Sequence, residues 1–166
     1  MKPYIFKQAF CIITLIIFTY VTHSYIQNKT IQIENNTLKG IILVLAAALL
    51  LFICNQLLYN YGQKETKFMQ HKLWDKMFIV IFIWLAISFV VFILLFFTTS
   101  LQQIFMTHPW MMLIIVYYFL FFINLFVLSI IHLAVDRSSK LERKLLFTWT
   151  SSTLLVAVIL FMFPTI

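Results

Sequence analysis

The chain has 166 residues, of which 63% are hydrophobic and only 10% are charged. A soluble domain is nearer half apolar and a quarter charged, so this chain has too few charges to cover a water-facing surface and is expected to be an integral membrane protein. The net charge of +7 does not indicate a nucleic-acid-binding protein, because the cations are few in each segment and lie beside apolar runs, where they act as topology signals and contact anionic lipid headgroups.

Five apolar runs follow one another along the chain. Each approaches or exceeds the ~20 residues that an α-helix needs to cross the hydrocarbon of a bilayer. Strands of a membrane barrel would alternate apolar and polar residues, whereas these runs are apolar throughout. The sequence therefore predicts an all-α, polytopic integral membrane protein, with a single transmembrane domain over residues 1–166 that forms a bundle of five transmembrane helices. The predicted helices are residues 4–23, 40–59, 77–98, 110–135 and 145–163.

The first run admits a second interpretation, because it has a basic start, an apolar middle and a polar end, as a secretory signal peptide does. Cleavage sites favour small residues in a defined pattern, and the segment Val21-Thr22-His23-Ser24 fits that pattern poorly. We therefore expect the first run to remain in the protein as a helix.

The connection between the third and fourth runs has two recognisable features. The segment from Leu101 to Met106 is amphipathic, and we interpret it as lying on the outer leaflet. Pro109 follows at the predicted first turn of the fourth helix, where its missing N–H costs no intrahelical hydrogen bond. Contact of this connection with an extracellular ligand or peptide is the alternative interpretation.

The distribution of basic residues predicts the orientation in the membrane. Ten of the 12 Lys and Arg residues lie in the N-terminal segment, after the second run or after the fourth run, and only Lys29 and Lys39 lie on the other side. Cytoplasmic segments are enriched in Lys and Arg, so we expect a cytoplasmic N-terminus, a C-terminus outside and a location in the plasma or inner cell membrane.

Polar residues inside the apolar runs are the first candidates for a site. All five acidic residues fall in loops or at helix ends, which argues against the proton-coupled transporters, pumps and aspartyl proteases that need a carboxylate at mid-depth. Six milder residues remain as a candidate intramembrane polar or partner face. They are Tyr117, Asn124, His132, Ser88, Asn55 and Gln56.

The fourth run carries the clearest polar stripe. At about 100° per residue, Tyr117, Asn124 and His132 fall within one sector of about 80° on a helical wheel. Because the Asn amide needs hydrogen-bond partners, this stripe is expected to face protein and not lipid. The main interpretation is hydrogen bonding between helices, and the alternative is a path for an ion or ligand. His132 and Asp136, at positions i and i+4, can also pair.

The loops after the second and fourth runs form a second candidate surface, which we expect to bind anionic lipid headgroups or a partner on the cytoplasmic side. Ser138 or Ser139 is predicted to cap the fifth helix, with Glu142 three to four residues further on. The residues of this cytoplasmic surface are Lys64, Lys67, Lys72, Trp74, Lys76, Arg137, Lys140, Arg143 and Lys144.

No cofactor or metal is expected, and no catalytic residue is assigned. Cys11 and Cys54 lie inside apolar runs without CxxC spacing, so we interpret them as small buried hydrophobic residues. The sequence contains no zinc-protease, nucleophile-elbow or phosphate-loop motif.

These observations predict a non-catalytic accessory, regulatory or stabilising subunit of a larger membrane complex, with a bacterial immunity protein as a variant. Its expected partners are the lipid bilayer, with anionic headgroups on the cytoplasmic side, and another membrane protein or a second copy of itself. One alternative is a small transporter or channel subunit with a path along the Asn124 and His132 face. Another is a lipid-acting membrane enzyme that would use His132, Asp136 and the neighbouring cations.

Overall fold

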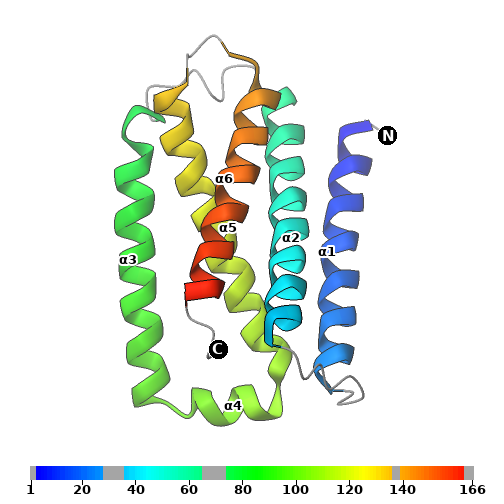
Figure 1. Cartoon of the computed structure of the whole chain (residues 1–166), viewed down its shortest axis with the longest axis vertical. Helices are drawn as coiled ribbons and strands as arrows, with labels where there is room; N and C mark the ends of the chain where they lie inside the picture. The colour runs from blue at the N-terminus through cyan, green and yellow to red at the C-terminus, as the bar shows by residue number, and fades with distance from the viewer. Residues whose placement is uncertain (1–2, 28–35, 65–73, 136–138, 163–166) are drawn as a thin grey trace.

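The computed structural model of the chain describes residues 3–27, 36–64, 74–135 and 139–162 (Figure 1). All regular structure within these residues is helical, which confirms the predicted all-α class. The helices are α1 (Pro3–Gln27), α2 (Asn36–Lys64), α3 (Trp74–Thr98), α4 (Leu101–Thr107), α5 (Pro109–Ala134) and α6 (Leu141–Met162).

Four of these helices are long and apolar enough to cross a bilayer, and they correspond to the second to fifth predicted spans. Their apolar stretches are Gly40–Gln63, Trp74–Thr98, Trp110–Ala134 and Leu141–Met162. α1 is helical over its whole predicted run, but its described apolar stretch, Phe6–Tyr20, is shorter than the ~20 residues of a full span. The described helices thus have the character of a multi-pass membrane protein, with four spans supported by length and composition where five were predicted.

α6 begins at Leu141, which is earlier than the predicted start of the fifth span. The Lys140 carbonyl accepts hydrogen bonds from the N–H groups of Arg143 at 3.1 Å and Lys144 at 3.3 Å, so Lys140 occupies the position that caps the helix. Ser139, one of the two predicted caps, lies one residue before this position, and Ser138 lies outside the described residues. The apolar boundary underestimates the helix because backbone hydrogen bonds continue beyond the hydrocarbon-facing residues.

The segment that was predicted to lie at the outer interface is a separate short helix. α4 runs across one end of the bundle and joins α3 to α5 (Figure 1). The His108 N–H donates to the Ile104 carbonyl at 2.7 Å, and α5 then begins at Pro109. Proline lacks the N–H that a continuing helix would need, so the chain turns here and starts a new helix.

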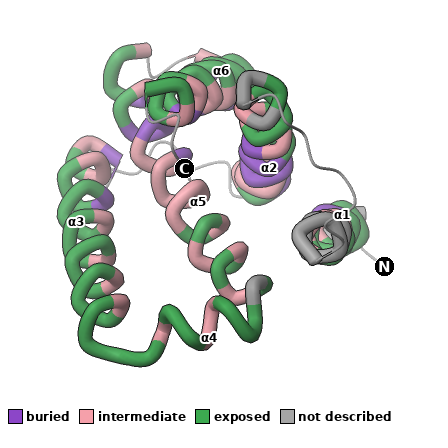
Figure 2. The backbone as a smooth tube through the Cα atoms, turned by 60° about the horizontal axis from the view of Figure 1, so that its bottom comes forward, coloured by how far each residue is buried: buried purple, intermediate pink, exposed green. Residues whose placement is uncertain are grey.

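α2, α5 and α6 form the centre of the bundle, with α3 packed on α5 and α1 packed on α2. Leu51 and Val156 belong to one buried cluster, which joins α2 to α6, and Trp74, Leu128 and Leu145 belong to a second, which joins the start of α3 to α5 and α6. Buried residues accordingly gather on the central helices, whereas α3 and α4 are largely exposed (Figure 2).

The helix ends that border the basic segments of the sequence meet at one end of the bundle, which we call the basic end. α1 begins, α2 ends, α3 begins, α5 ends and α6 begins there, opposite to α4 (Figure 1). The ten Lys and Arg residues that were predicted to be cytoplasmic all lie in or beside these helix ends in the sequence. The fold therefore brings together the helix ends that border the basic segments of the sequence.

Candidate functional site

Three buried polar side chains join α2, α5 and α6 inside the bundle. Asn124 Nδ2 donates to Asn55 Oδ1 at 2.8 Å, and Asn55 Nδ2 donates to the Leu145 carbonyl at 3.3 Å. Ser152 Oγ donates to Asn124 Oδ1 at 3.2 Å. Asn124 and Ser152 are fully buried and Asn55 nearly so. We call Asn55, Asn124 and Ser152 the polar core.

The polar core satisfies its own hydrogen bonds. Each of the two Asn side chains donates one hydrogen bond and accepts another, and each bond links two different helices. An amide left without partners in hydrocarbon would cost several kcal/mol, on the order of 2–7, so this arrangement removes a large penalty. The geometry fits hydrogen bonding between helices, which is the main interpretation of Asn124, and both Asn124 and Leu128 are fully buried.

Two other residues of the predicted polar face lie away from the polar core. The Tyr117 hydroxyl is buried and has no hydrogen-bond partner among the described residues. Ser88 is on α3, where its hydroxyl lies 2.9 Å from the Tyr118 hydroxyl of α5, and Trp84 Nε1 donates to the same Tyr118 oxygen at 2.7 Å. Ser88 therefore serves the packing of α3 on α5, and Tyr118, which the sequence did not single out, is its partner.

His132 lies at the basic end against two residues that were predicted on the surface. Lys144 Nζ is 3.3 Å from His132 Nδ1, and the Trp74 ring centroid is 5.6 Å from that of the imidazole. Lys144 is only 2% exposed, and Trp74 and His132 are also buried. Lys144 and Trp74 are therefore enclosed in the bundle and do not lie on the exposed lipid- or partner-binding surface that was predicted for them.

The helical phase of α6 explains the burial of Lys144. Lys144, Thr148 and Ser152 recur every four residues, so they lie on one face, and all three are buried. This face meets α5, as the contacts of Lys144 with His132 and of Ser152 with Asn124 show. The same spacing was a signal in the sequence for an inward polar face, and reasoning from charge alone missed it.

A different cause buries Trp74. The first turn of α3 packs onto the bundle, so that Trp74 belongs to the apolar cluster with Leu128 and Leu145. An indole at the start of a span is ordinarily read as an interfacial anchor. Here the packing of three helices against one another at the basic end encloses it.

The remaining described cations of the predicted cytoplasmic surface are exposed. Lys76, Lys140 and Arg143 face outward, and the Arg143 guanidinium lies 5.7 Å from the centroid of the Phe147 ring. These three side chains are therefore accessible at the surface of the described bundle. Asp136, the predicted partner of His132, lies outside the described residues. The side chains of the other predicted members of the surface are also not described; these are Lys64, Lys67, Lys72 and Arg137.

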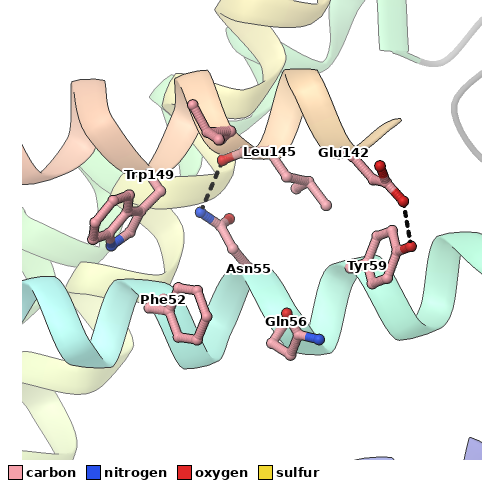
Figure 3. Close-up of a pocket in the computed structure, with 8 residues that line it drawn as sticks. Phe52, Asn55, Gln56, Tyr59, Glu142, Leu145 and Trp149 are labelled. Atoms are coloured by element: carbon pink, nitrogen blue, oxygen red, sulfur yellow. Dashed lines mark hydrogen bonds between the residues drawn. The ribbon is translucent and has the colours of Figure 1, made fainter. Parts of the chain in front are cut away.

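A pocket of about 390 Å³ lies between α2 and α6 beside the polar core (Figure 3). At one end the Tyr59 hydroxyl donates to Glu142 Oε1 at 2.7 Å, and Gln63 Nε2 donates to the Tyr59 oxygen at 2.6 Å. At the other end the rings of Phe52 and Trp149 pack edge to face, with centroids 6.1 Å apart. The pocket is lined by Phe52, Asn55, Gln56, Tyr59, Glu142, Leu145, Leu146 and Trp149.

Gln56, the last member of the predicted polar face, lies between two pockets. It lines the pocket shared by α2 and α6, and it also lines one of about 730 Å³ between α1 and α2. That larger pocket is mainly apolar and includes Lys7 and the buried Asn60. The structure thus places Gln56 beside the polar core without a direct bond to it among the described contacts.

Neither a group of metal-ligating side chains nor a disulfide occurs in the described part of the chain. Within residues 3–27, 36–64, 74–135 and 139–162, no three His, Cys, Asp or Glu side chains gather as a metal site requires. Cys11 and Cys54 are buried thiols that form no disulfide.

Comparisons with protein families, with characterised proteins and with solved structures find no match for this chain.

Proposed function

We propose that this chain is a non-catalytic, multi-pass subunit that stabilises or regulates a larger complex in the cell membrane. The observation that carries the proposal is the exposure of α3, which is apolar enough to cross the bilayer although only 6% of its most apolar stretch is buried within the bundle. Because its own chain covers so little of this span, most of its surface is available to lipid or to another membrane protein.

α3 meets the rest of the bundle along one face only. That face carries Ser88 and Trp84, which hydrogen-bond to Tyr118 of α5. The opposite face is apolar, exposed and spaced at i, i+4, i+7 and i+11, the pattern with which one helix packs on another. Its residues, which we call the outer face of α3, are Ile83, Ile87, Val90 and Leu94. Helices associate in a bilayer through such side-chain packing, so the outer face is the proposed docking surface.

The buried polar groups favour this role over the two alternatives. A transport path along the Asn124 and His132 face would need polar atoms that an ion or solute can reach, and these two side chains are buried and hydrogen-bonded to other helices. A lipid-acting enzyme would need His132 at the lipid surface, whereas Lys144 and Trp74 cover it. Both observations support a scaffold held together by its polar core.

The proposed topology has five spans, in which α1 crosses the membrane in addition to α2, α3, α5 and α6. α1 is 25 residues long, or about 37 Å at 1.5 Å per residue, which exceeds the ~30 Å hydrocarbon thickness. Lys7 in its second turn is exposed and can extend its ammonium toward the headgroups. With α1 inserted, the basic end lies in the cytoplasm and the C-terminus lies outside, in agreement with the positive-inside rule.

Site-specific photo-crosslinking in native membranes tests the proposal. A photoreactive amino acid at Ile83 or Ile87 is expected to capture one discrete membrane protein, identified by mass spectrometry. The same probe at Leu154, which is also apolar and exposed but lies on α6, serves as the control and should capture mainly lipid. Affinity purification in mild detergent should recover the same partner in fixed stoichiometry.

Two results would contradict the proposal. If Ile83, Ile87 and Leu154 all capture only lipid, and the chain purifies alone, then α3 is an ordinary lipid-facing span. If proteoliposomes that contain only this chain conduct a solute, and Asn124→Leu abolishes the flux in a protein that still folds, then the transport alternative replaces the subunit role.

A further inference from the structure

The pocket between α2 and α6 changes from apolar to polar along its length. Phe52 and Trp149 lie at one end, Leu145 and Leu146 follow, and the pair of Tyr59 and Glu142 is at the other end (Figure 3). From Phe52 to Tyr59, α2 rises by about 10 Å at 1.5 Å per residue. The polar end faces the basic end of the bundle, because α2 finishes and α6 begins there.

The pocket opens on the outside of the bundle. Phe52 and Leu146 are 55% and 59% exposed, so these side chains form a rim and not a buried wall. Both belong to helices that are apolar enough to span the membrane, so the environment at this depth is hydrocarbon. A ligand that reaches the pocket from this side is therefore a lipid, with its acyl part against the aromatic end and its headgroup beside Tyr59 and Glu142.

The polar end has the charge and the geometry to select the headgroup. Glu142 is the one acidic residue among those that line the pocket. The hydrogen bonds from Gln63 to Tyr59 and from Tyr59 to Glu142 Oε1 hold the carboxylate in one orientation, and no described residue donates to Oε2. A carboxylate held in this way is matched by a headgroup that donates N–H bonds from a cation.

An exposed cation follows Glu142 in the sequence but lies outside the pocket. The Arg143 guanidinium lies 5.7 Å from the centroid of the Phe147 ring, and neither residue lines the pocket. Selection of the headgroup therefore rests on the carboxylate of Glu142. We infer that the pocket between α2 and α6 is a binding site for a phospholipid whose headgroup carries a primary ammonium group. This inference is independent of the subunit role proposed above.

Native mass spectrometry of the full-length, delipidated protein in detergent tests the inference. The probes are phosphatidylethanolamine, phosphatidylcholine and phosphatidylglycerol with identical acyl chains, so that only the headgroup differs. The ethanolamine lipid is expected to bind at least about tenfold more tightly than the choline lipid, whose quaternary nitrogen has no N–H to donate. Glu142→Gln should remove that difference, and Asp75→Asn, an equal loss of charge outside the pocket, should preserve it.

A second variant separates this pocket from other lipid contacts. Leu146→Trp places a large ring at the exposed rim and should lower binding of the ethanolamine lipid by a similar factor, with an unchanged circular dichroism spectrum and melting temperature. Equal binding of the ethanolamine and choline lipids, or a preference that survives Glu142→Gln and Leu146→Trp, would overturn the inference. A stronger preference for phosphatidylglycerol would also overturn it, because an anionic headgroup does not match a carboxylate.

Discussion

The side-chain amides of Asn124 on α5 and Asn55 on α2 are hydrogen-bonded at 2.8 Å, although the two residues are 69 positions apart in the chain. Ser152 of α6 adds a third helix to this contact. The pair sets the rotation of α5 against α2, because turning either helix would place an amide in lipid. The central bundle is therefore defined by direction-specific bonds, and α1 and α3 add to it through mostly apolar contacts.

Removal of one amide of this pair should weaken the bundle measurably. Asn124→Leu preserves the side-chain size but leaves Asn55 Oδ1 and Ser152 Oγ without their partner, so the free energy of unfolding should fall by about 1–2 kcal/mol. Reversible unfolding in mixed micelles, followed by circular dichroism, measures this change. Asn55→Leu is expected to have a similar effect.

The double variant supplies the control for the same prediction. Asn55→Leu and Asn124→Leu together should cost less than the sum of the two single changes, since both remove the same bond. Asn60 lies on α2, as Asn55 does, but it lines the pocket toward α1. The losses of unfolding free energy from Asn60→Leu and Asn124→Leu should therefore be additive. Additive behaviour of the Asn55 and Asn124 changes would show that the bond is not formed in the protein.

Two neighbouring tyrosines of α5 should differ in how loss of the hydroxyl changes the free energy of unfolding. Tyr117→Phe removes a buried hydroxyl that has no partner among the described residues, so stability should be unchanged or slightly higher. Tyr118→Phe removes the acceptor of the Trp84 N–H bond and the partner of Ser88, so it should cost about 1 kcal/mol. Unfolding curves of the two variants measured side by side give the comparison, and equal losses would contradict this account of α5.

The burial of Lys144 predicts a difference in chemical reactivity. In the folded protein an amine-reactive ester should modify Lys76 and Lys140 readily and Lys144 slowly, because Lys144 is 2% exposed while the other two face outward. Peptide mass spectrometry after a short exposure quantifies each site. The protein unfolded in SDS is the reference, and there all three should react. Rapid labelling of Lys144 in the folded state would mean that the face of α6 toward α5 is open.

The proposed topology predicts that the two ends of the bundle can be labelled from opposite sides of the membrane. With Cys11 and Cys54 replaced by Ala, Gln103→Cys on α4 should react with an impermeant maleimide added to intact cells. Lys140→Cys at the basic end should react only after the membrane is permeabilised. Labelling of both positions from the same side would rule out the arrangement with α4 outside and the basic end inside.

Much of the fold follows from local pattern. The apolar runs predicted the long helices because a chain in hydrocarbon must satisfy its backbone hydrogen bonds within each segment. The stripe at Asn124 and His132 was correctly expected to face protein, since an amide needs partners that lipid lacks. The length of α6 and the separate helix α4 were less accessible, because helix ends depend on backbone bonds that hydropathy does not record.

The sequence by itself determined the membrane-like character of the chain and the all-helical architecture of its described residues, because these depend on composition and on spacing within single segments. Only the tertiary structure decided that Asn124 pairs with Asn55 and Ser152, that Lys144 and Trp74 are enclosed, and that Glu142 and Tyr59 meet at a pocket. Each of these depends on how one helix is rotated and shifted against another. Such contacts join residues far apart in the chain, and no local period of the sequence specifies them.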